Sequence, residues 1–183
     1  MPAPLEAGDV ADLNDAYAAA LFQIAKAEGN LERIEDELFR FARTLESNED
    51  LRMSLTDSTI PVERRQNIVQ ELLGGKALPV TVALISFVVG VGRGRTLPEI
   101  IDRLVAKAAE ERKEAVAEIR TAFPLDDAHR KRLAEALGRA TGKKISIKEV
   151  IDPSVLGGVT AIIGDTVIDG TIRHRLEQLR ESL

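Results

Sequence analysis

The hydrophobic pattern changes its period near residue 113, and this change constrains the fold more than any other feature of the sequence. Before it, apolar residues recur every three or four positions, as they do on one face of an α-helix. From Ala117 to Phe123, apolar and charged residues alternate instead, as they do along a strand. We therefore predict a mainly α-helical protein, in which a helical N-terminal domain precedes a small α+β domain.

The first domain is predicted over residues 12–112, after a flexible leader at 1–11. Its apolar periodicity and capping residues indicate six helices, which begin near Asp12, Asn30, Asn48, Pro61, Pro79 and Thr96. Six helices joined by short connections are typical of a helical bundle. The fifth, from Pro79 to Val91, is apolar around most of its circumference. Such a helix is either central or buries a second face against a partner.

The second domain is predicted over residues 113–183 with the element order β-α-β-β-β-α. After the first strand, Asp126 begins a helix that ends at Gly142, and residues 145–148 alternate as a second strand. Two short apolar runs, 159–163 and 166–169, flank Gly164-Asp165, which predicts a tight hairpin. Thr171 is then a suitable N-cap for a final helix.

Composition narrows the class of protein. The 183 residues are 44% hydrophobic but only 3% aromatic, so the core must be built mainly from aliphatic side chains and Ala. The chain has no Cys, which excludes disulfides and thiolate metal sites. No apolar run reaches the ~20 residues that span a bilayer, and the N-terminus is acidic, so a cytoplasmic protein is expected. The net charge of −5 makes nucleic acid an unfavourable partner.

No motif predicts catalysis, a metal or a cofactor. The glycines at 90, 92 and 94 follow a helix, so they indicate a C-cap and turn rather than a phosphate loop. His129 and His174 lack partners at metal-ligand spacing, and Ser154 has no nucleophile elbow. Asp152 and Asp169 could form a carboxylate pair, but beside Pro153 and Gly170 they are more typical of turns.

Two surfaces are candidates for binding a protein. Residues 130–148 hold seven basic residues and one acidic residue, which indicates either a solvated face or a site for an acidic partner. The candidate residues in it are Arg130, Lys143, Lys144 and Lys148. The first and fifth helices form the other surface, where Tyr17 either anchors an interface or fills the core.

The most specific stretch is Ile151-Asp152-Pro153-Ser154-Val155-Leu156-Gly157-Gly158-Val159, followed by Ile163-Gly164-Asp165-Thr166-Val167-Ile168-Asp169-Gly170-Thr171-Ile172-Arg173-His174-Arg175-Leu176. Together with Tyr17-Ala18-Ala19-Ala20-Leu21-Phe22 and Gly92-Arg93, it resembles the delta subunit of bacterial F-type ATP synthase, the counterpart of the mitochondrial oligomycin-sensitivity-conferral protein. The similarity covers the chain from about Asp12. Basic residues often precede the Tyr in that family, whereas Asp15 and Ala16 stand here.

The resemblance implies a non-catalytic stator subunit on the cytoplasmic face of the bacterial inner membrane, attached only through its complex and not forming homo-oligomers. The N-terminal domain would cap the catalytic head and hold the N-terminal helix of an alpha subunit between helices one and five. The expected lining is Tyr17, Ala20, Leu21, Ile24, Leu84, Phe87, Val88 and Val91. The C-terminal domain would hold the b subunits of the peripheral stalk. Two rivals remain: a generic two-domain adaptor, and a small enzyme built around Asp152 and Asp169.

Overall fold

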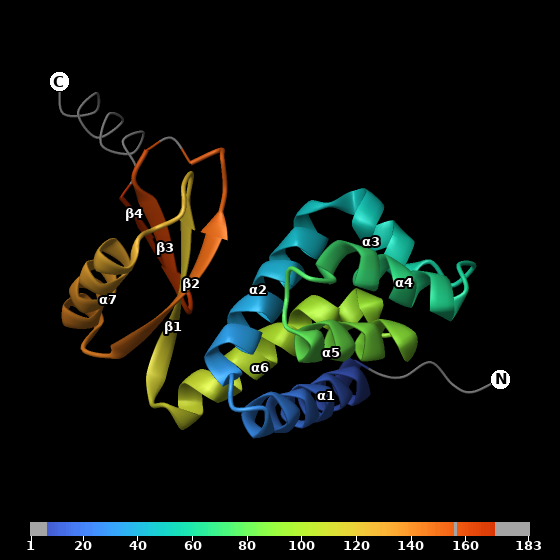
Figure 1. The fold of residues 1–183 in the computed structure, drawn as a ribbon. Helices are drawn as coiled ribbons and strands as arrows, with labels where there is room; N and C mark the ends of the chain where they lie inside the picture. Colours follow the sequence, from blue (N-terminus) through green and yellow to red (C-terminus); the bar gives the residue numbers. More distant parts are fainter. Residues whose placement is uncertain (1–6, 156, 171–183) are drawn as a thin grey trace. The chain divides into compact units, whose positions relative to one another are not determined.

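The computed structural model describes residues 7–155 and 157–170, which form two compact units that divide between Ala108 and Ala109 (Figure 1). The first unit contains α1 (Ala7–Ala27), α2 (Leu31–Ser47), α3 (Glu49–Thr56), α4 (Val62–Leu73), α5 (Pro79–Gly90), the 3-10 turn η1 (Gly94–Thr96) and most of α6 (Leu97–Glu111). The second contains β1 (Glu114–Thr121), α7 (Asp127–Thr141), β2 (Lys144–Ile151), β3 (Val159–Ile163) and β4 (Thr166–Asp169). The predicted order of six helices and then a sheet with one helix is confirmed.

Helix ends follow the capping residues with two exceptions. The side chain of Asn48 accepts a hydrogen bond from the Leu51 amide, and Asp126 accepts one from the His129 amide, as an N-cap does. Asn30, by contrast, makes no side-chain cap. The first helix begins at Ala7 rather than near Asp12, so the last residues of the expected leader are helical.

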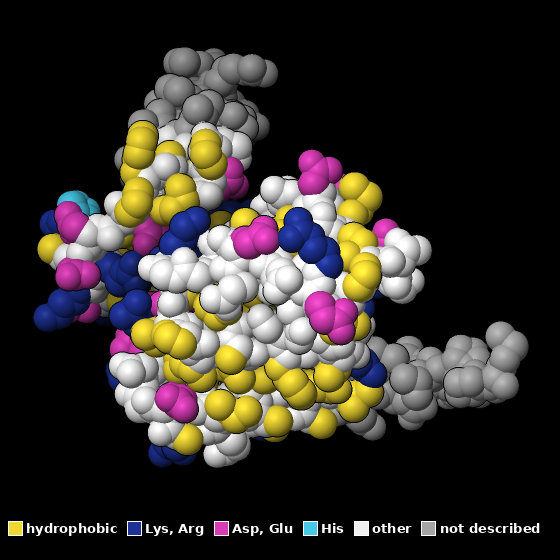
Figure 2. All heavy atoms as spheres, turned by 45° about the vertical axis from the view of Figure 1, so that its right-hand side comes forward, with side chains coloured by type: hydrophobic (Ala, Val, Ile, Leu, Met, Phe, Trp, Pro, Cys, Tyr) yellow, Lys and Arg dark blue, Asp and Glu magenta, His cyan; other side chains and the backbone are white. Residues whose placement is uncertain are grey.

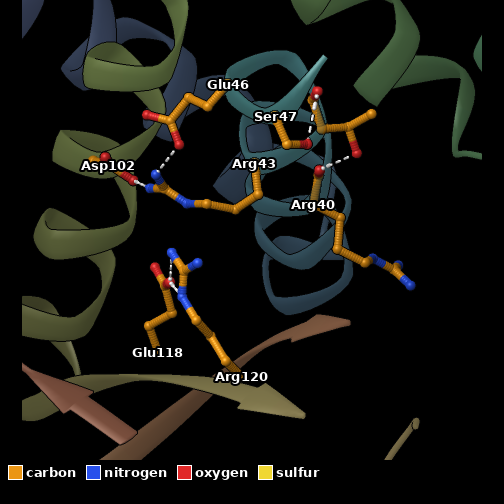
Figure 3. Close-up of polar contacts among 8 residues, drawn as sticks. Arg40, Arg43, Glu46, Ser47, Asp102, Glu118 and Arg120 are labelled. Carbon is orange, nitrogen blue, oxygen red and sulfur yellow. Dashed lines mark hydrogen bonds and ion pairs between the residues drawn. The ribbon is translucent and has the colours of Figure 1, made fainter. Parts of the chain in front are cut away.

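Helix α6 buries one apolar side in the helical unit. Leu97, Ile100 and Leu104 lie on its buried side at helical spacing and are at most 1% exposed. Polar contacts tie neighbouring helices to it: the Asn14 amide of α1 donates to Glu99 at 2.8 Å. Figure 3 shows Arg43 of α2 between Glu46 of the same helix and Asp102 of α6. The orientation of α1 and α2 against α6 is therefore fixed by both apolar packing and charge.

The sheet unit has the strand order β2-β1-β3-β4. Ile119 of the central strand β1 stands opposite Glu149 of the parallel β2 and opposite Ala161 of the antiparallel β3. One face of the sheet packs on α7 through a core of Ala117, Ile119, Leu137, Ile145, Ile147 and Ala161. On β1, Arg120 bonds Glu118 at 2.7 Å (Figure 3).

The predicted hairpin joins β3 to β4. Gly164 has a φ of +57°, the left-handed conformation that such a turn requires and that glycine adopts without strain. Before β3, the Asp152 carboxylate accepts hydrogen bonds from the amide and hydroxyl of Ser154. Asp152 thus forms a turn rather than half of a catalytic pair, as its position beside Pro153 predicts. The final helix expected after Thr171, with His174, lies outside the described residues.

Candidate protein-docking face

The apolar helix α5 buries only part of its circumference. Thr81, Val82, Leu84, Ile85, Val88 and Val89 face the interior of the unit. Ala83, Phe87 and Val91 recur at four-residue spacing on the opposite side and are exposed, Phe87 by 49% and Val91 by 46%. Since α5 contains no charged residue, this exposed stripe is wholly apolar or neutral. It is a second face without a partner in the described structure.

Helix α1 lies beside α5 and extends this stripe. Tyr17 of α1 contacts Phe87 of α5, and the centroids of the two rings are 6.2 Å apart. Ala20 and Ile24 follow Tyr17 along α1, both exposed, Ile24 by 45%. Figure 2 shows hydrophobic side chains gathered over α1 and α5. We call this surface, formed by Tyr17, Ala20, Ile24, Ala83, Phe87 and Val91, the α1–α5 face.

The position of α5 is fixed at its N-terminus by a carboxylate from another helix. Glu37 of α2 accepts hydrogen bonds from the Leu78 amide at 2.9 Å and the Thr81 hydroxyl at 2.6 Å. Burial by itself raises the pKa of Glu37, but these bonds and that from Arg33 outweigh it, so the pKa lies below its ordinary value. An ionised Glu37 therefore replaces the side-chain cap that α5 lacks.

The C-terminus of α5 is closed by a glycine turn. The Gly92 amide donates to the Val89 carbonyl at 3.1 Å and the Arg93 amide donates to the Val88 carbonyl at 3.0 Å, the hydrogen bonds of a Schellman motif. Gly92 has a φ of +78°, so the predicted C-cap role of this glycine is confirmed. The turn directs Arg93 back over Tyr17, with its guanidinium carbon 5.6 Å from the ring centroid.

The predicted lining residues divide into two groups. Tyr17, Ala20, Ile24, Phe87 and Val91 lie on the α1–α5 face. Leu21, Leu84 and Val88 do not, because they are 1%, 4% and 1% exposed and belong to the core. Some of the expected residues must face the core of the bundle, and an almost uniformly apolar helix such as α5 gives no signal for which ones do. The missed residue, Ala83, could have been found from its four-residue spacing to Phe87.

The basic segment of the sheet unit is less uniform than its sequence suggests. Arg130 bonds Glu149 at 2.8 Å and thereby ties α7 to β2. Lys144 bonds Glu114 at 2.6 Å, although its side chain is 73% exposed. Lys148 is only 2% exposed, so it does not belong to the expected solvated face. Lys143 is exposed, in the turn between α7 and β2.

Titratable side chains and helix apolarity in the described residues bear on other kinds of site. Among them, no group of three or more His, Asp or Glu side chains is placed to hold a metal ion. His129 is exposed and bonds Asp126, which is also the cap of α7. Hydrogen bonds from the amide and ring of His129 hold the pKa of Asp126 below its usual range. No described helix has the length and apolarity that crossing a bilayer requires.

Hollows on the helical unit lie away from the α1–α5 face. One, of about 410 Å³, is polar and is lined by residues of the α1–α2 turn and the start of α2, from Gly29 to Arg40. Another, of about 300 Å³, lies among α2, α3 and α4 and is lined in part by Phe41, Leu51 and Leu72. Neither of these hollows is lined by a residue of the α1–α5 face, whose exposed apolar stripe is of the kind on which a helix docks.

Comparison with known proteins gives a consistent family. Residues 13–183 match the family model described as ATP synthase delta (OSCP) subunit. The chain is 40% identical over 165 residues to ATP synthase subunit delta of Salinispora arenicola (strain CNS-205), covering 90% of this chain and 60% of that protein. It is 41% identical over 179 residues to ATP synthase subunit b-delta of Mycobacterium sp. (strain KMS), covering 96% of this chain and 40% of that one.

The chain spans about three-fifths of the length of the delta subunits it matches. Its fold is similar to that of a chain in the cryo-EM structure of the Toxoplasma gondii mitochondrial ATP synthase hexamer, with a TM-score of 0.53 and 20% identity. That likeness covers 93% of this chain and 96% of the other, and it supports the fold alone. The family model covers nearly the whole chain. This chain belongs to the ATP synthase delta (OSCP) subunit family.

Proposed function

We propose that this chain is a non-catalytic stator subunit of a rotary ATP synthase, which joins the catalytic head to the peripheral stalk. Rotation of the central shaft would turn the head unless the head were held, so a static link is needed for torque to drive ATP synthesis. The helical unit would bind the N-terminal helix of an alpha subunit, and the sheet unit would bind the b subunits. The chain would reach the cytoplasmic side of the membrane only through this complex.

The exposed α1–α5 face is the observation that carries this proposal. Its residues lie on two adjoining helices, with an aromatic pair, Tyr17 and Phe87, at a shared contact. An amphipathic helix that lays its apolar side on such a stripe is a common mode of peptide recognition. Aromatic anchors are enriched among the residues that contribute most binding energy. The face therefore fits a partner helix of that kind.

The mechanical role sets the required affinity. An interface of about 1,600 Å² with well-packed anchors can reach a nanomolar dissociation constant, or about −12 kcal/mol. A micromolar contact would release far more often and would not transmit torque through many turnovers. We therefore expect both junctions to be tight when assembled, although each isolated peptide contact would be weaker because it presents only part of the interface.

The sheet unit is proposed to meet the stalk through its basic surface. Lys143 and Lys144 project from the turn between α7 and the start of β2, where they are available to acidic side chains. Arg130 would not contact the stalk directly, since it already bonds Glu149. Lys148 is buried, so it too would support the surface rather than contact the stalk. This leaves Lys143 as the clearest candidate for direct contact.

Substitution of Tyr17 tests the head-binding role. Tyr17→Ala should weaken binding of a peptide that carries the alpha-subunit N-terminal segment by about tenfold or more, because truncating a buried aromatic anchor typically costs over 1 kcal/mol. Isothermal titration calorimetry with the full chain measures this. Met53→Ala is the matched control, since Met53 is 51% exposed on α3, outside the face. Unchanged affinity for Tyr17→Ala would contradict the proposed docking face.

Recovery from membranes separates the stator from a generic adaptor. Tagged chain, incubated with detergent-solubilised membranes of the source bacterium, should recover the catalytic head subunits. An adaptor of another system would recover different proteins. An enzyme built around Asp152 and Asp169 is disfavoured because Asp152 is occupied by Ser154 and Asp169 already has an interaction.

A further inference from the structure

Among the described residues, Arg93 is a cation without an ion pair that lies against one end of the α1–α5 face. Along the face itself, α5 has no charged residue. Beside Tyr17, the carboxylate of Asp15 is already bonded to Arg103 at 2.6 Å. At the far end of α1, Lys26 lies over the Phe22 ring and has a further interaction of its own. The remaining cation next to the apolar stripe is Arg93.

The fold holds Arg93 in place. Its backbone is fixed by the Schellman turn at Gly92, and its guanidinium lies over Tyr17 at 5.6 Å. Within the described residues, Arg93 forms no ion pair and is half-buried. A guanidinium that rests on a ring still presents N–H groups at its edge, in a planar fork that matches a carboxylate. Arg93 is therefore positioned to donate hydrogen bonds to an acidic group of another protein.

The two helices run in opposite directions, so Tyr17 and Arg93 mark one end of the face, while Ile24 lies toward the other end (Figure 1). Apolar contact alone distinguishes poorly between the two directions in which a helix can lie on such a stripe. A charged group at one end supplies that distinction, because a carboxylate placed at the wrong end loses its partner.

We propose that Arg93 binds an Asp or Glu side chain near one end of the docked helix and thereby fixes which end of that helix lies beside Tyr17. This rests on the proposed function, since the docked helix is that of the alpha subunit. The partner is then an amphipathic helix with an apolar stripe for the α1–α5 face and an acidic residue at the Tyr17 end. Arg93 determines direction, and the apolar residues supply most of the affinity.

A double-mutant design with the full chain tests this. Two peptides are titrated by calorimetry: the alpha-subunit N-terminal segment, and the same segment with its Asp and Glu replaced by Asn and Gln. Arg93→Gln should weaken the acidic peptide about threefold to tenfold at low ionic strength, and less as salt rises, as for a partly exposed charge pair. It should not weaken the amide peptide. Arg95→Gln, two residues away, is the matched control and should change neither affinity by more than about twofold.

Direction is read separately with a nitroxide label at the N-terminus of the acidic peptide. In the unmodified chain, the label should broaden amide NMR signals at one end of the face only; with Arg93→Gln, signals near both Tyr17 and Ile24 should broaden. Equal weakening of both peptides by Arg93→Gln would mean that Arg93 only supports the Tyr17 ring, and no weakening would mean no contact; either result overturns the inference and leaves docking intact. If the unmodified chain binds neither peptide, both the inference about Arg93 and the head-binding proposal fail.

Discussion

Glu37 is the residue on which the placement of α5 most depends. Its carboxylate joins α2 to the first turn of α5 through the Leu78 amide and the Thr81 hydroxyl, far from Glu37 in sequence. Nothing in the local pattern around Glu37 indicates this role, since the residue stands among other acidic side chains of α2. A long-range cap of this kind depends on tertiary packing, and the sequence carries no periodic signal for it.

Replacing Glu37 should lower stability in a pH-dependent way. Glu37→Gln is expected to cost about 1–3 kcal/mol near neutral pH, because it replaces a charge-assisted acceptor with an amide. Since the pKa of Glu37 is lowered in the folded state, its contribution is fully present above its unfolded pKa and is lost as the pH falls through the folded value. The gap in melting temperature between the two proteins should therefore narrow on acidification.

Glu32→Gln is the control for this measurement, because Glu32 is exposed at the start of α2. It should shift the melting temperature by little at any pH. A gap between the unmodified protein and Glu37→Gln that stays constant from about pH 7 to pH 3 would show that the carboxylate charge is not what holds α5.

At the scale of elements, the turn after α5 combines two tasks in two residues. Gly92 ends the helix in a left-handed conformation, and Arg93 then lies over Tyr17. A Cβ built at Gly92 would meet no atom within 4 Å, so any cost of substitution comes from the backbone alone. A substitution at Gly92 therefore tests conformational strain without steric overlap.

Gly92→Ala should therefore destabilise the helical unit by about 1–2 kcal/mol, the cost of a side chain in the left-handed region. Gly92→Asn should cost less, because Asn tolerates that conformation better than other non-glycine residues. Urea denaturation followed by circular dichroism measures both. Equal losses for Ala and Asn would contradict a backbone cause.

Charge reversal tests the turn between α7 and β2. Lys143→Glu should weaken binding of a soluble b-subunit fragment at low ionic strength, with the difference fading as salt screens the charge. Lys144 is a poorer choice because its reversal would also repel Glu114, its present partner at 2.6 Å. Lys107→Glu on α6 is the control. If neither salt nor Lys143→Glu changes the affinity for the stalk fragment, this basic surface does not bind the stalk.

The sequence predicts the buried side of an element well where apolar residues occupy one face only. It predicts that side poorly where every face of the element is apolar. The stripes of α2 and α6, the caps Asn48 and Asp126 and the Gly164 turn all follow from local pattern. In α5 the periodic signal vanishes because apolar residues occupy every side, so Leu84 and Val88 were assigned to the face. The burial of Lys148 is hidden for a related reason, since a charged residue on a strand gives no sign of being buried.

At the scale of the whole molecule, the charge is divided between the two parts. Residues 1–112 hold 13 basic and 19 acidic residues, and residues 113–183 hold 12 basic and 11 acidic, which gives −6 and +1. Divided instead between Ala108 and Ala109, as the compact units are, the sequence has 12 basic and 17 acidic residues in 1–108, or −5, and 13 of each in 109–183, or zero.

Because the helical unit and the sheet unit have separate cores, we expect each to unfold independently of the other. Ile119→Ala should remove a fully buried side chain from the sheet core and destabilise that unit by about 2–5 kcal/mol. Hydrogen exchange measured by mass spectrometry should quicken in β1, β2 and β3 while protection in α1 and α5 is unchanged. Affinity for the alpha-subunit peptide should remain within about twofold. Faster exchange in α5 would reveal that the two units unfold together.

The position of Tyr17 also gives the molecule an optical property. It is the single Tyr of a chain with no Trp, and it lies on the α1–α5 face. Ultraviolet emission excited near 280 nm therefore originates at this face, and the sheet unit is silent. A docked helix without Tyr or Trp would alter that emission by changing solvent access, and one that carries Trp would quench it by energy transfer. Occupancy of the face can thus be followed in the unlabelled protein.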